Sequence, residues 1–222
     1  MKYYAIIVAG GSGKRMQHTV AKQFLLLKSE PVLMHTVRAF ASCSFTPQII
    51  IVLNPTLHLY WKDLCKKYNF SIPHLLIEGG EQRFHSVRNG LMTIKADDGI
   101  IAIHDAVRPL TSTNLIEKTY QIAETEGNAI ACIKPSDSVR KIESKTESKI
   151  VDRDELVLIQ TPQTFQINQL KNAYQQAYQA KFTDDASVVE AAGFKINLIE
   201  GERNNLKITY PEDLALANLL IK

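Results

Sequence analysis

The sequence is short of three features that would place it in a special class of protein: cysteine, an excess of one charge, and long hydrophobic runs. Its three cysteines are widely spaced and form no CxxC pair, which favours reduced thiols in a cytoplasmic protein over a disulfide framework. Lys and Arg number 26 against 23 Asp and Glu, and this small, dispersed excess argues against nucleic acid as a partner. No apolar run is long enough to span a membrane, so we expect no membrane partner.

The first apolar run, MKYYAIIVAGG, reads better as a buried strand than as a signal peptide. Its apolar part is short, and GGSGKR follows it where a small-residue cleavage site would be needed. The chain has 222 residues, 45% of them hydrophobic, which is enough for a substantial core. We therefore predict a single domain over residues 1–222.

Short apolar runs alternate with segments of helical period along the chain. Strands separated by helices in this way predict βαβ units and a Rossmann-like α/β fold, with a mostly parallel twisted sheet and helices on both faces. The strands are expected at 3–9, 48–54, 74–80, 99–109, 128–135 and 194–201, and the helices at 31–43, 56–68, 85–94, 112–127 and 211–222. A ligand of such a sheet binds at the carboxyl ends of the strands, which here are residues 10–13, 80–83 and 104–108.

One segment, at about 136–158, breaks this rhythm because it is polar and alternating. SVRKI and KIVDR read as two exposed strands joined by the turn-rich ESKTES. A strand pair this polar buries little by itself. We therefore expect a protruding β-arm, and two interpretations stay open: the arm reaches onto another subunit, or it is a solvated surface hairpin.

The turn after the first strand concentrates glycine and positive charge. It holds three glycines and three cations within thirteen residues: Gly10, Gly11, Gly13, Lys14, Arg15 and Lys22. Glycine lets consecutive backbone N–H groups point into one concavity, which binds phosphate oxygens. The turn therefore predicts a site for a polyanion such as a triphosphate, with a purely structural tight turn as the alternative.

Two common phosphate-binding motifs do not fit this turn. The dinucleotide fingerprint G-x-G-x-x-G, started at Gly11, would need its third glycine at Met16. The P-loop pattern would need a glycine at Val8 and a hydroxyl residue at Arg15. The sequence thus disfavours an NAD-linked dehydrogenase and a P-loop nucleotide hydrolase.

A resemblance to a known family rests on this turn and on five further blocks. AGGSGKRM followed by AKQF is similar to the signature loop of the nucleotidyltransferases that join a nucleoside triphosphate to a phosphorylated sugar or polyol. GGEQRFHSV, IHDAVRP, TPQTF, TDDAS and NNLKITYPEDL follow in the order of the 2-C-methyl-D-erythritol 4-phosphate cytidylyltransferase family, which belongs to the non-mevalonate isoprenoid pathway. The matching blocks extend from one end of the chain to the other.

The resemblance implies a role for each matching residue. Arg15 and Lys22 are implied to be catalytic, acting on the α-phosphate of CTP and its transition state. The implied CTP contacts are Gly10, Gly11, Gly13, Gly80, Glu81, Arg83, Ser86 and Asp105. The implied polyol-phosphate contacts are Asp105, Arg108, Thr161, Thr183 and Lys207, joined in a homodimer by Ser138 and Arg153 of the partner subunit's β-arm. Thr183 or Asp184 would also cap a helix beginning in DDASVVEAAG.

The reaction that the resemblance implies needs fixed charge rather than a proton acceptor. The attacking phosphate monoester is already an anion at pH 7, because its second pKa is about 6. Two polyanions must meet, so cations and Mg²⁺ lower the barrier, and the Mg²⁺ is expected to be held mainly by the triphosphate. His104, next to Asp105, is accordingly expected to be a packed histidine rather than an acid–base or metal-binding group.

Two alternatives to this function are left open by the sequence. The same blocks would fit a cytidylyltransferase for another polyol phosphate, such as ribitol 5-phosphate, and the arm and the surroundings of Thr161 would carry the difference. A non-catalytic nucleotide-binding protein on the same fold would be marked by loss of Arg15 or Lys22, and both are present.

Overall fold

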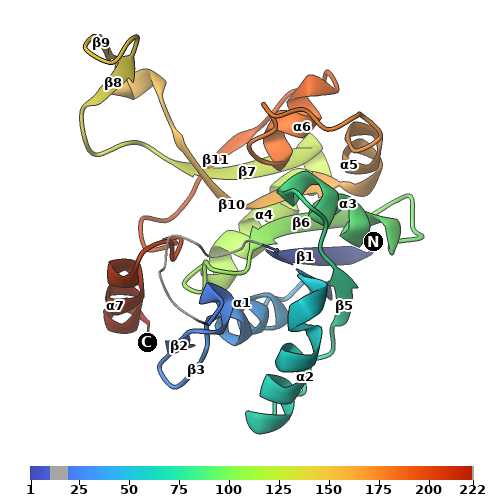
Figure 1. The fold of residues 1–222 in the computed structure, drawn as a ribbon. Helices are drawn as coiled ribbons and strands as arrows, with labels where there is room; N and C mark the ends of the chain where they lie inside the picture. The colour runs from blue at the N-terminus through green and yellow to red at the C-terminus, as the bar shows by residue number, and fades with distance from the viewer. Residues whose placement is uncertain (11–19, 222) are drawn as a thin grey trace.

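The computed structural model describes residues 1–10 and 20–221 and has a seven-stranded sheet at its centre (Figure 1). The strand order is β11-β7-β10-β6-β1-β4-β5. β10 runs antiparallel to its neighbours β6 and β7, and the other neighbouring pairs are parallel. The strands are β1 (Tyr3–Ala9), β4 (Gln48–Leu53), β5 (Leu75–Glu78), β6 (Ile100–Asp105), β7 (Asn128–Ile133), β10 (Leu158–Gln166) and β11 (Leu198–Glu200). The mostly parallel α/β fold predicted from the sequence is therefore confirmed.

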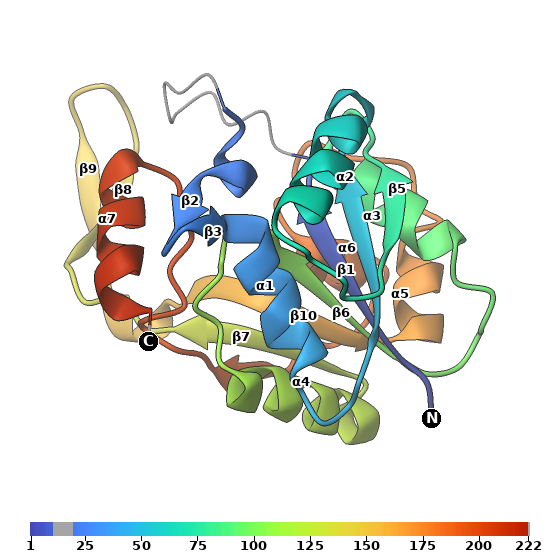
Figure 2. The same ribbon diagram turned by 90° about the horizontal axis from the view of Figure 1, so that it is seen from below.

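Helices cover both faces of this sheet, as Figure 2 shows from a second direction. One face carries α1 (Val32–Ala41), α2 (His58–Lys67) and α4 (Thr113–Glu126), and the other carries α3 (Arg83–Met92), α5 (Ile167–Ala173) and α6 (Asp185–Ala191). α7 (Pro211–Leu220) packs beside the small hairpin of β2 (Leu26–Leu27) and β3 (Glu30–Pro31). None of the helices in the described part of the chain combines the length and the apolar character that a membrane crossing requires.

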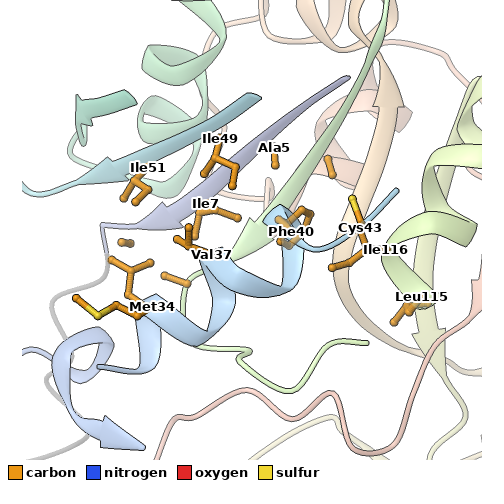
Figure 3. Close-up of a cluster of buried hydrophobic side chains, with 14 of the residues drawn as sticks. Ala5, Ile7, Met34, Val37, Phe40, Cys43, Ile49, Ile51, Leu115 and Ile116 are labelled. Carbon is orange, nitrogen blue, oxygen red and sulfur yellow. The ribbon is translucent and has the colours of Figure 1, made fainter. Parts of the chain in front are cut away.

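The core on the first face follows directly from the strand and helix periods (Figure 3). Ile7 of β1 and Ile51 of β4 extend toward α1. That helix presents Met34, Val37 and Phe40, three residues apart and so on one side. Burying each of these large side chains contributes roughly 1.5–3 kcal/mol. Successive strand residues point to opposite sides of the sheet. The strand residues next to Ile7 and Ile51 therefore face the other side, where they pack against α3, α5 and α6 in a second core.

The expected helix over 112–127 shows how its ends are determined. The Ser112 hydroxyl accepts a hydrogen bond from the backbone N–H of Leu115, so Ser112 is the N-cap of α4. Gly127 ends the helix with a φ of 90°, a left-handed conformation that glycine adopts without steric cost. The sequence predicted Ser112 or Thr113 as the cap and Gly127 as the end of this helix, and the structure has Ser112.

The polar segment at 136–158 forms the predicted β-arm. β8 (Val139–Ile142) and β9 (Ser148–Val151) pair in a separate antiparallel sheet that projects away from the body of the molecule (Figure 1). The expected end of the arm needs a small correction, because Leu158 already begins β10. Ile142 and Ile150 are 79% and 78% exposed on the arm, so its apolar side chains pack little against their own chain.

β10 was not predicted from the sequence, although this strand lies in the interior of the sheet. Its residues LIQTPQTFQ are mainly polar, and Pro162 cannot donate a ladder hydrogen bond, so the segment lacks the pattern of a buried strand. In the structure, side chains from other elements provide hydrogen-bond partners for the buried polar groups of β10. The Thr164 hydroxyl donates to that of Thr119 at 2.9 Å, and the Gln163 amide donates to the Asp184 carboxylate at 3.0 Å.

Candidate active site

A cleft of about 320 Å³ opens at the carboxyl ends of β1 and β6. It brings together residues from four separate blocks of the sequence. The predicted site residues that line it are Gly10, Lys22, Gly80, Glu81, Arg83, Ser86, Asp105 and Lys207. The cleft therefore lies at the carboxyl ends of the strands, where a ligand was predicted, and it is built from the residues that the motifs selected.

The other predicted site residues lie elsewhere. Arg108 and Thr161 are buried behind Asp105, and Thr183 is exposed just before α6. Ser138 and Arg153 are exposed on the arm. Gly11, Gly13 and the cations Lys14 and Arg15 lie outside the described residues.

The segment that carries Lys22 is anchored to the body of the protein. Gln23 is buried, and its side-chain amide donates to the backbone carbonyl of Ala9 at 3.0 Å, at the end of β1. Phe24 packs against two aromatic side chains of α2. The Lys22 ammonium donates to the backbone carbonyl of Ile208 at 3.3 Å. Lys22 is thus held beside the cleft between the end of β1 and the 201–209 loop.

The Ser86 hydroxyl lies where the loops after β1 and β5 meet α3. It accepts a hydrogen bond from the backbone N–H of Gly80 at 3.0 Å and donates to the carbonyl of Gln82 at 3.2 Å. A Cβ on Gly10 would lie 3.1 Å from this hydroxyl, and a Cβ on Gly80 would lie 2.4 Å from that of His85. The absence of side chains at these two glycines therefore lets the loops approach α3 closely.

Asp105, at the end of β6, is surrounded by three cations. Its Oδ2 lies 2.9 Å from Lys207 Nζ and 3.6 Å from Arg108 Nε, and its Oδ1 lies 3.8 Å from Arg83 Nε. Burial by itself raises the pKa of this carboxyl group, but the three cations outweigh burial and hold the pKa well below its usual range. Asp105 is therefore a fixed negative charge at neutral pH.

Arg83 is held from the side opposite Asp105. Its guanidinium donates to both oxygens of Asp185, at 2.8 and 2.7 Å, and Tyr174 donates to the same carboxylate at 2.6 Å. Burial lowers the pKa of Arg83, but the Asp185 carboxylate outweighs burial and raises it. Arg83 was predicted as a site residue and Asp185 was not, although Asp185 lies in the TDDAS block that carries part of the resemblance.

Arg108 supports Asp105 from behind. It is 8% exposed, and its Nη1 donates to the backbone carbonyl of Asn205 at 2.6 Å. Burial lowers the pKa of this guanidinium, an effect that the nearby Asp105 only partly offsets. The backbone N–H of Asp105 donates to the Thr161 hydroxyl at 3.1 Å, so two predicted polyol-phosphate contacts form the layer on which Asp105 rests.

His104 is the packed histidine that the sequence analysis expected. It is fully buried, and its Nε2 lies 3.1 Å from the backbone carbonyl of Arg108, so Nε2 carries the hydrogen and donates it. Burial lowers the pKa of His104 to about 4. The neutral ring therefore helps to fix the turn between Asp105 and Arg108.

Of the two residues predicted to cap α6, Asp184 rather than Thr183 is the N-cap. The Asp184 side chain accepts a hydrogen bond from the backbone N–H of Ser187 at 2.9 Å.

The fold and the cleft fit an α/β nucleotidyltransferase, because a mostly parallel sheet carries Gly10, Gly80 and clustered cations at the carboxyl ends of its strands. The model of the 2-C-methyl-D-erythritol 4-phosphate cytidylyltransferase family matches residues 3–222. The chain belongs to this family.

Individual relatives agree with the family assignment over the whole chain. A 2-C-methyl-D-erythritol 4-phosphate cytidylyltransferase of Phocaeicola vulgatus is 46% identical over 221 residues and is covered in full, as is this chain. The enzyme of the same name from Bacteroides thetaiotaomicron is 44% identical, with full coverage of both chains. The crystal structure of the Francisella tularensis enzyme superposes with a TM-score of 0.84 at 28% identity, again over both full chains.

Proposed function

We propose that this protein joins CTP to 2-C-methyl-D-erythritol 4-phosphate, forming the CDP-polyol and releasing pyrophosphate in the non-mevalonate isoprenoid pathway. The observation that carries this proposal is the cleft itself. It unites Lys22, Ser86, Asp105 and Lys207 from four blocks that are far apart in the sequence. The full-length family match supports the same reaction.

The two substrates would divide the cleft between them. The Gly80–Ser86 side offers backbone edges and the Ser86 hydroxyl to the small cytosine ring and its ribose. The turn at Gly10, continued by Gly11, Gly13 and Arg15 in the sequence, would bind the triphosphate. The polyol phosphate would then lie toward Asp105 and Lys207, with Thr161, Arg108 and Thr183 around that end.

The chemistry would depend on fixed charge. A phosphate oxygen of the polyol phosphate attacks the α-phosphorus of CTP, the bond from the α-phosphorus to the bridging oxygen breaks, and pyrophosphate leaves with that electron pair. The Lys22 ammonium, held by Ile208 at 3.3 Å, would stabilise the charge that develops on the α-phosphate. Lys207, 2.9 Å from Asp105, would reduce the repulsion between the two reacting phosphates. No step needs His104 to move a proton.

We propose Mg²⁺ as the cofactor, bound mainly by triphosphate oxygens. Among the described residues no three His, Cys, Asp or Glu side chains are grouped closely enough to hold a metal ion by themselves. The carboxylates that line the cleft are Glu81 and Asp105, and carboxylate oxygens are ligands that Mg²⁺ accepts alongside substrate phosphates. Bound there, the ion would neutralise charge on the triphosphate.

The proposal includes a homodimer formed through the β-arm. Ile142 and Ile150 expose most of their apolar surface, which favours cover by a second copy of the chain. A groove of about 350 Å³ on the arm is lined by Ser138 and Arg153, the two residues expected to complete the partner's site.

The proposal also includes a reducing, cytoplasmic location. The free state of Cys43, Cys65 and Cys132 supports it.

Steady-state kinetics with purified protein, CTP and Mg²⁺ would test the proposed reaction. The polyol phosphates to compare are 2-C-methyl-D-erythritol 4-phosphate and ribitol 5-phosphate, with pyrophosphate release as the readout. We expect kcat/KM to be at least about 100-fold higher for the methylerythritol phosphate. A preference for ribitol 5-phosphate would contradict the proposed substrate, and nucleotide binding without turnover of either would contradict the proposed reaction.

A further inference from the structure

The loop of residues 201–209 contains a fully buried asparagine that the motif analysis did not single out. Asn205 is 0% exposed, although it lies in a loop between the exposed Asn204 and the half-buried Leu206. A buried side-chain amide must be hydrogen-bonded to be tolerated. Its partners therefore indicate what keeps it there.

The Asn205 side chain attaches the loop to β10. Its Nδ2 donates to the backbone carbonyl of Thr161 at 2.8 Å and approaches the Gln160 amide oxygen at 3.4 Å. Thr161 in turn accepts from the backbone N–H of Asp105 through its hydroxyl. Asn205 is therefore connected to the end of β6 by hydrogen bonds through a single intervening residue, Thr161.

The backbone of this loop accepts hydrogen bonds from the buried Arg108 and from Lys22 of the cleft, and the loop also carries Lys207. The carbonyl of Asn205 accepts from Arg108 Nη1 at 2.6 Å. Two residues later, Lys207 pairs with Asp105 at 2.9 Å, and the carbonyl of Ile208 accepts from Lys22. A movement of this loop would therefore displace the charges on the Arg108 and Lys207 side of the cleft.

We propose that Asn205 is a positioning residue for the polyol-phosphate half of the site. Its amide fixes the loop to Thr161 and thereby fixes Arg108 and Lys207 relative to Asp105. This inference rests on the proposed function, since it assigns that half of the cleft to the polyol phosphate. The Gly80 and Ser86 contacts of the nucleotide half are made to α3 and do not depend on the loop, whereas Lys22, which the loop holds through Ile208, would act on turnover rather than on CTP affinity.

The geometry predicts that loss of the Asn205 amide weakens binding of the polyol phosphate and leaves CTP binding unchanged. Without the amide, the Thr161 carbonyl loses its 2.8 Å donor, and the loop is free to shift by fractions of an ångström. Arg108 has the backbone carbonyl of Asn205 as a hydrogen-bond acceptor, so the guanidinium would move with the loop. Small displacements of positioned charges cost large factors in substrate use.

Asn205→Ala and Asn204→Ala form a matched pair, because the two asparagines are adjacent and only one is buried. In Asn205→Ala we expect the KM for 2-C-methyl-D-erythritol 4-phosphate to rise at least tenfold, while the Kd for CTP stays within twofold. Asn204→Ala should leave both within twofold of the parent. An equal loss for both substrates, or no change in either, would overturn the positioning role. Failure of the unmodified protein to turn over this polyol phosphate would instead overturn the proposed function.

A double-mutant cycle separates positioning from general damage to the fold. If Asn205 acts through Arg108, then Asn205→Ala should raise the KM less than threefold in an Arg108→Ala background. Full additivity of the two changes would contradict the inference. Should Asn205→Ala fail to fold, Asn205→Ser removes the reach to Thr161 while filling more of the space, and the same split between KM and Kd is expected of it.

Discussion

Arg83 and Asp185 are 102 residues apart in the chain, and their side chains make two parallel hydrogen bonds of 2.8 and 2.7 Å. The pair joins α3, which lines the cleft, to the first turn of α6. Such fork-to-fork contacts fix orientation as well as distance. Arg83 is therefore a cation of fixed position, which lies close to Asp105 but makes its hydrogen bonds to Asp185.

Replacing Asp185 by Asn should be costly, because it leaves the Arg83 charge without its main partner. Removing one member of a buried ion pair destabilises a protein by about 3 kcal/mol or more. Tyr174→Phe is the matched control, since it removes only the 2.6 Å hydrogen bond to the same carboxylate and should cost about 1 kcal/mol. Urea unfolding followed by fluorescence of the single tryptophan, Trp61, measures both. Equal losses in the two variants would contradict the assignment.

Gly80 and Gly79 allow a test of the close approach between the β5 loop and α3. A Cβ at Gly80 would lie 2.4 Å from that of His85, whereas a Cβ at Gly79 meets no atom nearer than 3.4 Å. Gly80→Ala should therefore lower the free energy of unfolding by about 1–3 kcal/mol and raise the KM for CTP. Gly79→Ala should stay within about 0.5 kcal/mol of the parent. If the adjacent pair behaved alike, the tight contact at Gly80 would not be what requires glycine.

Lys22→Ala should lower kcat far more than it weakens CTP binding. The ammonium is fixed by the Ile208 carbonyl, and a preorganised group that meets charge in the transition state is worth about 100- to 1,000-fold in kcat. Calorimetry should show a change in CTP Kd of less than about tenfold. Lys95→Ala, at an exposed lysine between α3 and β6, is the control. A change confined to KM would count against a transition-state role, and the same comparison applies to Arg15→Ala.

Much of this architecture could be predicted from the sequence, because the apolar runs carry it. β1, β4 and β6 are continuous apolar segments, and β1 and β6 end in glycine or charge, so both their existence and the position of the cleft followed from pattern alone. β10 could not be found in this way. Its polar residues are satisfied by partners such as Thr119 and Asp184, and such tertiary hydrogen bonds leave no periodic trace in a sequence.

The same distinction separates the site residues that could be predicted from the sequence from those that could not. Gly10, Lys22, Ser86 and Lys207 were predicted from their motifs, and they line the cleft. Asp185 and Asn205 lie inside matching blocks but were passed over, because each acts on another protein side chain or on the backbone rather than on a substrate. Their roles depend on which groups the fold brings to them, and spacing along the chain does not contain that information.

The β-arm makes a prediction about subunits that mixing can test. If the Arg153 that completes each site comes from the partner subunit, an Arg153→Ala chain and a Lys22→Ala chain can form a mixed dimer with one intact site. Equal mixing should then restore about a quarter of the parent activity at low polyol phosphate, since half of the dimers are mixed and each has one working site. An arm that serves its own chain would restore none.

The apolar surface of the arm allows a second measurement on the same assembly. Ile150→Asp places a charge where the structure exposes an isoleucine, so it should leave the fold of the chain intact and weaken the dimer. Sedimentation velocity should show a shift from dimer to monomer, with loss of turnover. Lys145→Asp, at the exposed turn of the same hairpin, should leave the dimer unchanged. A monomeric parent protein would refute the dimer outright.

His104 gives the stability a pH dependence whose sign follows from its burial. Its pKa is lowered from 6.5 to about 4 in the folded protein, so between these values the unfolded chain binds a proton that the native state does not. Stability is therefore lost as pH falls from about 6.5 to 4, by about 3 kcal/mol at most. Asp105, whose pKa is also lowered, loses its contribution only at more acidic pH. Urea unfolding at several pH values should show the slope in the parent protein and a flatter one in His104→Gln, which keeps a donor for the Arg108 carbonyl. Parallel curves for the two proteins would show that another group titrates in this range.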